Sequence, residues 1–351
     1  MKRTSLYEKH LALKAKMVNF SGWEMPVQYT SVKDETVAVR ESVGVFDVSH
    51  MGEFFVEGPD AIAFCDYLVT NDFKEAAIGK AVYSPLCRED GTVIDDLILY
   101  KLAEQKVLIC VNASNIDKDF DWMTKQVGSF NVNLTNQSEK YSLLALQGPK
   151  SFEILKAILP GTPDLEYYSI WSPVEGTYIA RTGYTGEDGF ELFSNHQQIN
   201  NWWNEMLSRG VTPCGLASRD VLRLEVAYPL YGHELNDETT PLDAGLKWTV
   251  KMKKERFIGK KALESYDPKF SLIKIGLNTG IPREKYPVCL EDGTVVGEVT
   301  SGTLSVKLNH GIAFARVKKG TPTDKLYVDI RNKKYPATLF QKAFVTGGHK
   351  K

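Results

Sequence analysis

The stretch GTVIDDLILYKL, residues 91–102, places two adjacent aspartates inside an otherwise apolar and β-branched segment. That composition is typical of a buried β-strand. Successive side chains of a strand point to opposite faces, so Asp95 and Asp96 should face opposite ways. Asp95 should share its face with Val93, Leu97 and Leu99, and Asp96 with Ile94, Ile98 and Tyr100. Neither face is polar throughout. At least one carboxylate should therefore lie in an apolar or enclosed space, where it persists only with partners, a raised pKa or a chemical use.

A second candidate segment, RTGYTGEDGFE, carries glycines at positions 183, 186 and 189. Glycine-rich loops can bind phosphate, but Glu187 and Asp188 would repel an anion and no P-loop lysine follows. A tight hairpin is the better interpretation. Glu191 lies just past the hairpin, where a carboxylate could accept two parallel hydrogen bonds from a ligand. A surface glutamate at a strand end remains the alternative.

A third segment, SRDVLRLEVAY, places Arg219 and Arg223 four residues apart and hence on one helical face. A guanidinium there suits an anionic ligand. An ion pair of Arg219 with a nearby acid such as Asp220 or Glu225 is an equally good interpretation.

The remaining titratable residues give little sign of other chemistry. The five cysteines and six histidines are dispersed, which argues against a disulfide framework and against a structural metal site. No dinucleotide-binding fingerprint follows a predicted strand. His50 invites a general-base role, but we favour a structural histidine whose hydrogen bonds are satisfied.

The elements that must position these residues can be outlined from periodicity and turn signals. We expect irregular backbone around Gly22 and Pro26, and a helix that Ser114 caps. Other helices are expected at about 5–17, 32–42, 58–72, 150–159, 196–210 and 218–232. Strands are expected at 81–88, 92–102 and 106–112 as an antiparallel meander, at 141–147, and at 176–194 as a hairpin. From about residue 270 only strand and turn patterns remain, which predicts a small all-β domain.

The bulk composition is that of a globular protein. The chain has 351 residues, of which 43% are hydrophobic and 25% charged, and this length predicts two or three domains. No apolar run of ~18 residues or more occurs, which excludes a transmembrane helix. The first residues lack the apolar core of a signal peptide, so we expect a cytoplasmic protein.

Charge is distributed unevenly along the chain. Residues 246–351 hold 22 Lys and Arg against 9 Asp and Glu, whereas the other 245 residues hold 21 against 35. The carboxyl-terminal third could face an acidic partner or ligand, or could simply be a solvated lysine-rich surface.

Several stretches, in the same order along residues 5–317, resemble the aminomethyltransferase family of the glycine cleavage system, the T-proteins. They are NFSGWEMPVQY, VFDVSHMGEF, GTVIDDLILYKL, VNASNIDKDF, ALQGP, RTGYTGEDGFEL, SRDVLRLE with PLYGHEL, PLDAGL, FIGKKAL and VTSG. The resemblance implies an α+β fold, a three-domain cloverleaf of antiparallel sheets and helices around a central cavity, with a carboxyl-terminal all-β barrel-like domain. The implied domains are 1–50 with 140–240, 51–139 with 241–270, and 271–351.

The resemblance also implies a reaction and its participants. Family members transfer the one-carbon unit of an aminomethyl-lipoyl H-protein to tetrahydrofolate, their co-substrate, and release ammonia. By resemblance Asp96 is the catalytic acid, Glu191 holds the pterin ring and Arg219 binds folate. The remaining implied pocket-lining residues are Tyr184, Asn112, Tyr83, Tyr100 and Met51. No metal and no nucleic-acid or membrane partner is implied.

Two departures from the family pattern stand out. SGTLSVKL follows the VTSG turn, where relatives often carry Ser-Pro. The tail KAFVTGGHKK has neither the tyrosine nor the arginine with which relatives commonly touch ligand. The alternatives are another folate-dependent methyl-transferring or demethylating enzyme on the same scaffold, including a sarcosine or dimethylglycine dehydrogenase module, or a non-catalytic folate-binding protein. The dehydrogenases need an additional flavin domain, and the cysteine-containing signature of the non-catalytic group is not found here.

Overall fold

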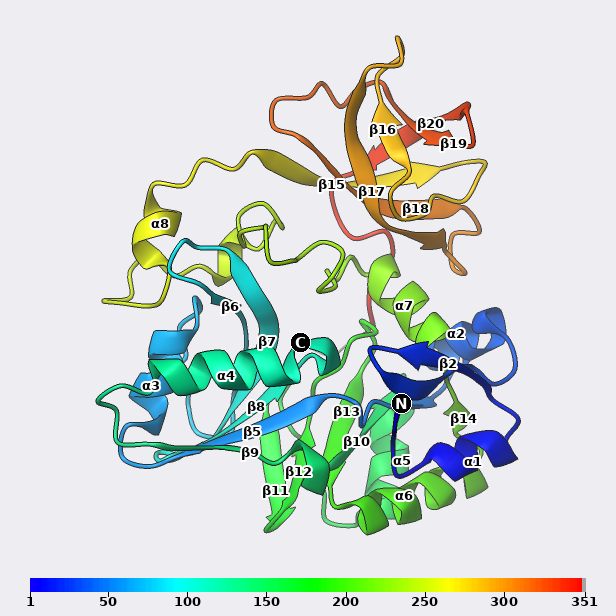
Figure 1. The fold of residues 1–351 in the computed structure, drawn as a ribbon. Helices are drawn as coiled ribbons and strands as arrows, with labels where there is room; N and C mark the ends of the chain where they lie inside the picture. Colours follow the sequence, from blue (N-terminus) through cyan, green and yellow to red (C-terminus); the bar gives the residue numbers. More distant parts are fainter. Residues whose placement is uncertain (349–351) are drawn as a thin grey trace.

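The computed structural model describes residues 1–348, which four β-sheets organise (Figure 1). A six-stranded and a five-stranded sheet pack together, a three-stranded sheet lies near the amino terminus, and a closed six-stranded barrel follows residue 269. The expected α+β class with largely antiparallel sheets and a carboxyl-terminal barrel is confirmed. Across residues 1–348 no helix is both long and apolar enough to cross a membrane.

The six-stranded sheet gathers strands that lie far apart in the chain. Its order is β11 (Ile170–Val174), β12 (Thr177–Ala180), β13 (Gly189–Ser194), β10 (Ser142–Gln147), β4 (Gly44–Asp47) and β14 (Thr212–Pro213). Helices α5 (Ser151–Ile158) and α6 (His196–Ser208) pack on one face, where Leu155 and Trp203 join its apolar core. The hairpin expected at 176–194 is confirmed as β12 and β13, joined by the loop 181–188.

The five-stranded sheet is antiparallel throughout. Its order is β6 (Ala81–Cys87), β7 (Val93–Ala103), β8 (Lys106–Val111), β5 (Gly52–Glu57) and β9 (Asn133–Asn136). The predicted meander is confirmed, because β6, β7 and β8 are neighbours in chain order. Helices α3 (Ala61–Leu68) and α4 (Ile116–Gln126) contribute Phe64 and Met123 to the core on one face. A short 3₁₀ turn, η2 (Ser138–Lys140), follows β9.

The other faces of these two sheets meet in a shared core. Phe55 and Tyr100 of the five-stranded sheet lie in one buried cluster with Tyr178 and Phe193 of the six-stranded sheet. The rings of Tyr100 and Phe193 meet edge to face with centroids 5.7 Å apart. Segments that belong to different sheets, and lie some 90 residues apart in the chain, are thereby held against each other.

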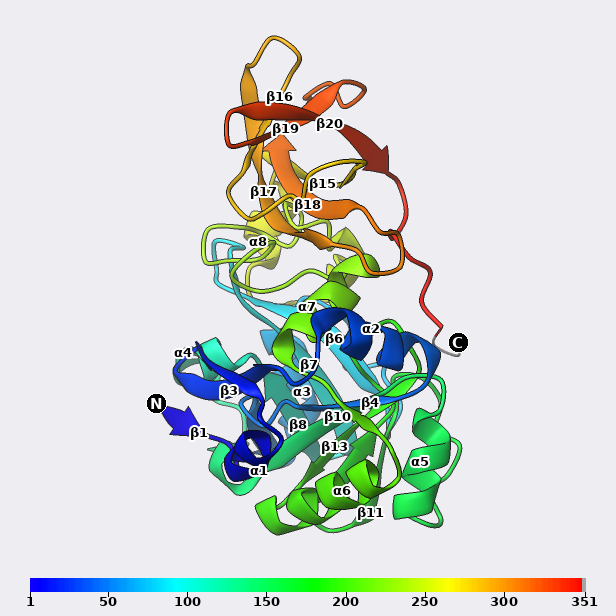
Figure 2. The same cartoon turned by 90° about the vertical axis from the view of Figure 1, so that its right-hand side faces the viewer.

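The carboxyl-terminal barrel sits on helix α7 (Leu216–Glu225), as two perpendicular views show (Figures 1 and 2). Its order is β15 (Phe270–Leu277), β18 (Gly311–Lys318), β17 (Val295–Leu304), β16 (Pro287–Cys289), β19 (Leu326–Ile330) and β20 (Lys333–Phe340). Leu224 of α7 packs in an apolar cluster with Ile312 and Phe314 of β18. Closure of the barrel removes the free edges of its sheet.

The amino-terminal region differs from the sequence prediction. The predicted helix 5–17 is shorter, because α1 (Tyr7–Ala12) ends before Lys14, whose φ of 57° lies in the left-handed region. The expected irregular backbone is instead a sheet of β1 (Lys2–Arg3), β3 (Trp23–Gln28) and β2 (Lys16–Phe20). Gly22 forms its turn with a φ of 84°, and Pro26 sits beside a β-bulge, where its missing N–H is tolerated.

Three predicted helices need adjusted bounds. The helix predicted up to residue 42 is α2 (Val32–Glu41), capped by the Ser31 side chain. The helix predicted at 58–72 is only α3, and the one at 218–232 is α7, which ends before Ala227 with its φ of 59°. Ser114 does not cap a helix, since it lies in a 3₁₀ turn, η1 (Ala113–Asn115), that leads into α4.

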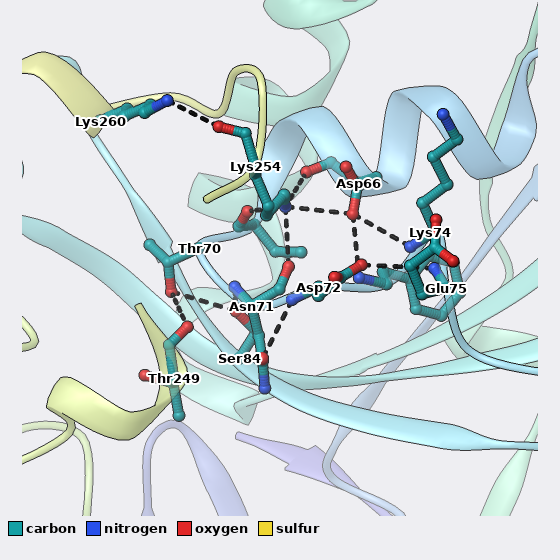
Figure 3. Close-up of polar contacts among 12 residues, drawn as sticks. Asp66, Thr70, Asn71, Asp72, Lys74, Glu75, Ser84, Thr249, Lys254 and Lys260 are labelled. Carbon is teal, nitrogen blue, oxygen red and sulfur yellow. Dashed lines mark hydrogen bonds and ion pairs between the residues drawn. The ribbon is translucent and has the colours of Figure 1, made fainter. Parts of the chain in front are cut away.

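A buried lysine fixes the chain that links α7 to the barrel (Figure 3). Lys254 is only 9% exposed. Its Nζ donates to the carbonyl oxygens of Asp66, Val69 and Asn71 at 2.6, 2.8 and 2.7 Å, at the carboxyl-terminal end of α3. A cation there satisfies carbonyls that the helix leaves unpaired. The linker's own elements, η3 (Lys247–Thr249) and α8 (Lys260–Glu264), are thereby held beside the five-stranded sheet.

Candidate active site

A β-bulge in β7 lies directly before the two adjacent aspartates. The pairs between β7 and β6 are Asp96 with Pro85, Asp95 with Leu86, and then Val93 with Cys87. Ile94 is the extra residue, so the alternation of faces breaks there. Ile94 packs in the core beneath α3 and α4, while Val93 joins a different cluster. The residues predicted to share a face with each aspartate are therefore wrong for Val93 and Ile94 and right only for residues 97–100.

Asp95 is completely buried and firmly held. Its Oδ1 accepts hydrogen bonds from the Nδ2 atoms of Asn112 and Asn115 at 2.8 and 2.7 Å. Its Oδ2 accepts from the backbone N–H of Asn112 at 3.0 Å. Three N–H donors hold the Asp95 carboxylate in place, so its role here is structural.

Asp96 is partly exposed and has two donors from flanking strands. The hydroxyl of Tyr83 in β6 donates to Oδ2 at 2.9 Å, and Nδ2 of Asn112, just past β8, donates to Oδ1 at 3.1 Å. Burial, followed by the negative charge of Asp95, raises the pKa of Asp96 to about 7. A carboxyl group that titrates near neutrality can accept or return a proton under ordinary conditions.

Trp248 packs on Tyr83, the residue that donates to Asp96, although sequence reasoning missed it. It lies in η3, and its ring stacks on that of Tyr83 with centroids 6.0 Å apart and planes inclined by 25°. The Trp248 side chain is 60% exposed, unusual for so large an apolar group. The only sequence signal was a tryptophan set close to two lysines, which is weak. An exposed aromatic face next to a reactive carboxyl can receive a flat ligand.

Glu191 forms a second polar centre, on β13. The side chain is buried, at 9% exposure, and accepts hydrogen bonds from the hydroxyls of Thr182 and Tyr100, at 2.5 and 3.4 Å. Burial raises its pKa, against the opposing effects of Thr182, the Arg219 charge and Tyr100. Tyr100 itself is fully buried, so its hydroxyl serves this carboxyl rather than open space. No ion pair joins Glu191 to another residue within 1–348.

Arg219 on α7 forms a third centre, and its charge is not neutralised by a partner. Its guanidinium lies 4.6 Å from the centroid of the Tyr184 ring. It makes neither a hydrogen bond nor an ion pair with any residue of the described chain, so the expected alternative of a pair with Asp220 or Glu225 is wrong. Burial lowers the pKa of Arg219. An unpaired, half-buried guanidinium is a ready site for an anion.

Arg223, four residues on, takes the pairing role instead. Its guanidinium binds Asp220 and Glu234 and donates to the Ser301 hydroxyl of β17 at 2.7 Å. The two arginines of one helical face therefore differ: Arg223 joins α7 to the barrel, and Arg219 has no acidic partner within residues 1–348.

Met51 and His50 flank these centres. Met51 is half-buried and packs against the core that the two sheets share. His50 is 3% exposed, and its Nδ1 has no hydrogen-bond partner, so the expected satisfied histidine is wrong. Burial, and then the charge of Arg219, lowers the pKa of His50 to about 4. The imidazole is therefore neutral at pH 7, edge to face with Phe20.

The three polar centres lie within electrostatic reach of one another. Burial raises the pKa of Tyr184, on which the charges of Asp96 and Arg219 also act. The Arg219 charge in turn acts on Glu191. A titratable carboxyl, a buried acceptor and a cation without an ion-pair partner in the described chain thus influence one another through Tyr184 and Arg219. Among residues 1–348 no cluster of His, Cys, Asp or Glu is arranged to bind a metal.

The tail approaches the same region from the barrel. The backbone N–H of Val345 donates to the carbonyl of Glu225 at 2.8 Å. A Cβ on Gly347 would lie 2.2 Å from the carbonyl oxygen of Gly186, so only glycine fits there. Residues 349–351, the end of the divergent tail, lie outside the described part of the chain.

Comparisons with known proteins cover nearly the whole chain. Residues 6–254 match the family model described as the GCVT N-terminal domain, and residues 271–346 match that of the glycine cleavage T-protein C-terminal barrel domain. The chain is 45% identical to the aminomethyltransferase of Thermosipho melanesiensis, over all of this chain and 99% of that protein. It is 46% identical to that of Thermotoga maritima, over 91% of this chain and 90% of the relative.

A solved structure agrees with these sequence relatives. The crystal structure of glycine cleavage system aminomethyltransferase T from Bartonella henselae superposes with a TM-score of 0.96 at 33% identity. The match covers all of this chain and 99% of the other.

Proposed function

The chain belongs to the aminomethyltransferase family of the glycine cleavage system, the T-proteins, and from this premise we propose which residues and partners carry out its reaction. It is a one-carbon transferase of that system. The one-carbon acceptor in the proposal is tetrahydrofolate, and the donor is the aminomethyl-lipoyl arm of the H-protein. Neither the alternative methyl-transferring enzymes nor the non-catalytic folate binders are favoured by any observation above.

The proposed reaction balances without an oxidant or reductant. N5 of tetrahydrofolate forms a bond to the methylene carbon of the aminomethyl group as the carbon–nitrogen bond of that group breaks and ammonia leaves. The carbon–sulfur bond to the lipoyl arm then breaks as N10 closes the methylene bridge. The protons of N5 and N10 leave with ammonia and the freed thiol.

Asp96 is the proposed catalytic residue. Its carboxylate would hydrogen-bond N10, steer the N10 proton and stabilise positive charge on the folate nitrogens. The observation that carries this role is a partly exposed carboxyl, held by Tyr83 and Asn112, with a pKa near 7. Proton transfer is most efficient when the catalytic group titrates near the working pH.

The other two centres supply binding. Glu191 is the proposed clamp for the adjacent N–H and NH₂ of the pterin ring, with Tyr100 holding the carboxyl. Arg219, with its unpaired charge over Tyr184, is proposed to bind the anionic end of folate. Asn112, Tyr83 and Met51 complete the proposed pocket.

The domain division is also a proposal. The six-stranded sheet draws its strands from 44–47 and 142–213, and the five-stranded sheet from 52–136. Lys254 attaches the linker to α3. These facts support domains of 1–50 with 140–240, 51–139 with 241–270, and 271–351. A cytoplasmic location is likewise proposed; the five free, buried cysteines fit a reducing compartment.

The test is an assay of 5,10-methylenetetrahydrofolate formed from aminomethyl-lipoyl H-protein, with and without tetrahydrofolate. Asp96→Asn should lower kcat by about a thousandfold while tetrahydrofolate binding, measured by calorimetry, is retained. Glu104→Gln is the matched control, because Glu104 is an exposed carboxylate at the end of the same hairpin. An unchanged rate in Asp96→Asn would refute the catalytic role.

A further inference from the structure

Asp119 is a buried acid to which the proposed reaction gives no role. It lies on α4, is fully buried, and neither of its carboxyl oxygens has a hydrogen-bond donor within the described chain. An ionised carboxylate in such a place costs several kcal/mol, since nothing replaces its water. A buried polar group of this kind calls for an explanation.

Three charged groups act on Asp119: Asp95 and Asp96 of β7 and Lys118 of α4 itself. The Asp95 charge acts in turn on Cys110 of β8 and on Tyr231. Lys118 is already engaged, with its Nζ 2.7 Å from the hydroxyl of Tyr231 and 3.4 Å from Asp237. Asp119 therefore has no cation of its own.

The carboxyl of Asp95 lies within hydrogen-bond reach of the Asp119 carboxyl. Two carboxylates cannot both be ionised at such a distance in a dry interior, so one of them holds a proton. Asp95 already accepts three N–H donors, whereas Asp119 accepts none. The proton consequently belongs on Asp119. Burial, and then the Asp95 charge, raises the pKa of Asp119 well above its ordinary value, in agreement with this assignment.

We propose that Asp119 is a positioning residue, a neutral carboxylic acid whose O–H donates to Asp95, so that the pair carries one negative charge and anchors Asn112 against Asp96. The proposal rests on the role of Asp96 given above. Asn112 connects the Asp119–Asp95 pair to Asp96. Its Nδ2 donates to Asp95 Oδ1 at 2.8 Å, to Asp96 Oδ1 at 3.1 Å and to the Asp96 carbonyl oxygen at 3.0 Å.

The single charge on this pair has a catalytic consequence. The anion at Asp95 raises the pKa of Asp96, after burial, and so keeps the reactive carboxyl near neutrality. A second anion at Asp119 would push that pKa higher still and leave less carboxylate at pH 7. The proton on Asp119 limits the repulsion to one charge.

A first test reads the proton directly and does not depend on turnover. Infrared difference spectra of the full-length protein at about pH 9, where free carboxyl groups are ionised, should show a protonated carboxyl band that Asp119→Asn removes. Asp121→Asn, an exposed acid on the same helix, should leave the band in place. A spectrum unchanged by Asp119→Asn would overturn the proposal. If Asp96→Asn kept full activity, the catalytic role proposed for Asp96 would be refuted. The infrared test of the Asp119 proton would still be valid, because it does not depend on turnover.

A second test uses the pH dependence of kcat/KM for tetrahydrofolate. The Asp96 carboxylate is the active form, so kcat/KM should fall as pH drops through about 7. Asp95→Asn removes a negative neighbour and should move that midpoint to lower pH. Asp119→Asn replaces one neutral donor with another and should leave the midpoint in place. A midpoint that falls in Asp119→Asn would show an ionised Asp119 and contradict the proposal.

A third variant separates positioning from folding. Asp119→Leu keeps the branched shape of the side chain but removes the donor, and should lower kcat about tenfold with little change in KM, the loss expected for one hydrogen bond. Asp119→Asn should recover most of that loss. Equal kcat in the Leu and Asn variants would show that the donor has no positioning role.

Discussion

Asp95 and Asp96 are neighbours of the same residue type, and the alternation of faces along β7 separates their chemistry. Asp95 lies under α4, among three N–H donors, and Asp96 lies on the side of Tyr83, whereas the bulge at Ile94 changes only the residues before them. Sequence alternation was enough to predict opposite faces. It could not predict the bulge, because a bulge depends on how β6 and β7 pair and leaves no mark in the local pattern.

For other residues too, the residue type could be read from the sequence, whereas the contacts that decide its role come from distant parts of the chain. Arg219 could be proposed as an anion site from its type, but its lack of a partner follows from Arg223 taking Asp220 and Glu234. Trp248 and Asp119 were missed, since their importance comes from Tyr83 and Asp95, which are far away in the sequence.

Glu191 gives a prediction at the residue scale. Glu191→Ala removes a buried acceptor that would receive two hydrogen bonds from the pterin ring, so the Kd for tetrahydrofolate should rise about a hundredfold. Titration calorimetry measures the change. Glu175→Ala, at an exposed turn of the same sheet, is the matched control and should bind normally. Equal affinities in the two variants would reject the clamp.

At the scale of elements, turns and strands were predicted better than the segment near the amino terminus. The meander of β6, β7 and β8 and the all-β tail were evident because glycine-containing turns divide clear β-branched runs. The sheet of β1, β2 and β3 was not, since Gly22 and Pro26 are local signals for irregular backbone. Antiparallel pairing of β2 with β3 across the Gly22 turn forms the sheet despite these signals.

The linker held by Lys254 gives a prediction at this scale. Lys254→Met leaves three carbonyls at the end of α3 without a donor and should lower the free energy of unfolding by about 3 kcal/mol. Chemical denaturation measures it. The exposed Lys253→Met should change stability by less than about 0.5 kcal/mol. Because η3 carries Trp248, a loss of activity below the unfolding temperature is also expected in Lys254→Met.

At the scale of the whole molecule, the carboxyl-terminal third carries an excess of basic residues, and its barrel packs on α7. Residues 246–351 carry 22 basic against 9 acidic residues. We infer that this surface attracts an acidic partner, and the H-protein is the partner that the proposed function requires. The uneven distribution of charge is evident from the sequence alone. The sequence could not show that the basic barrel rests on α7, the helix that carries Arg219.

The salt dependence of partner binding tests this inference. The KM for aminomethyl-lipoyl H-protein should rise steadily between about 0.05 and 0.5 M salt, because screening weakens attraction between surface charges. A double change, Lys251→Glu with Lys253→Glu, should raise KM at low salt, whereas Lys150→Glu outside the basic third should not. A KM independent of salt would exclude electrostatic docking.

Helix α7 meets two parts of the molecule at once, with Arg219 toward the ligand region and Arg223 bonded to Ser301 of the barrel. Loosening the barrel would therefore shift the guanidinium that we propose binds the anionic end of folate. Mild heating should weaken folate binding before the sheets unfold. Destabilising substitutions in the barrel should lower folate affinity in the same way as substitutions in the proposed catalytic centre.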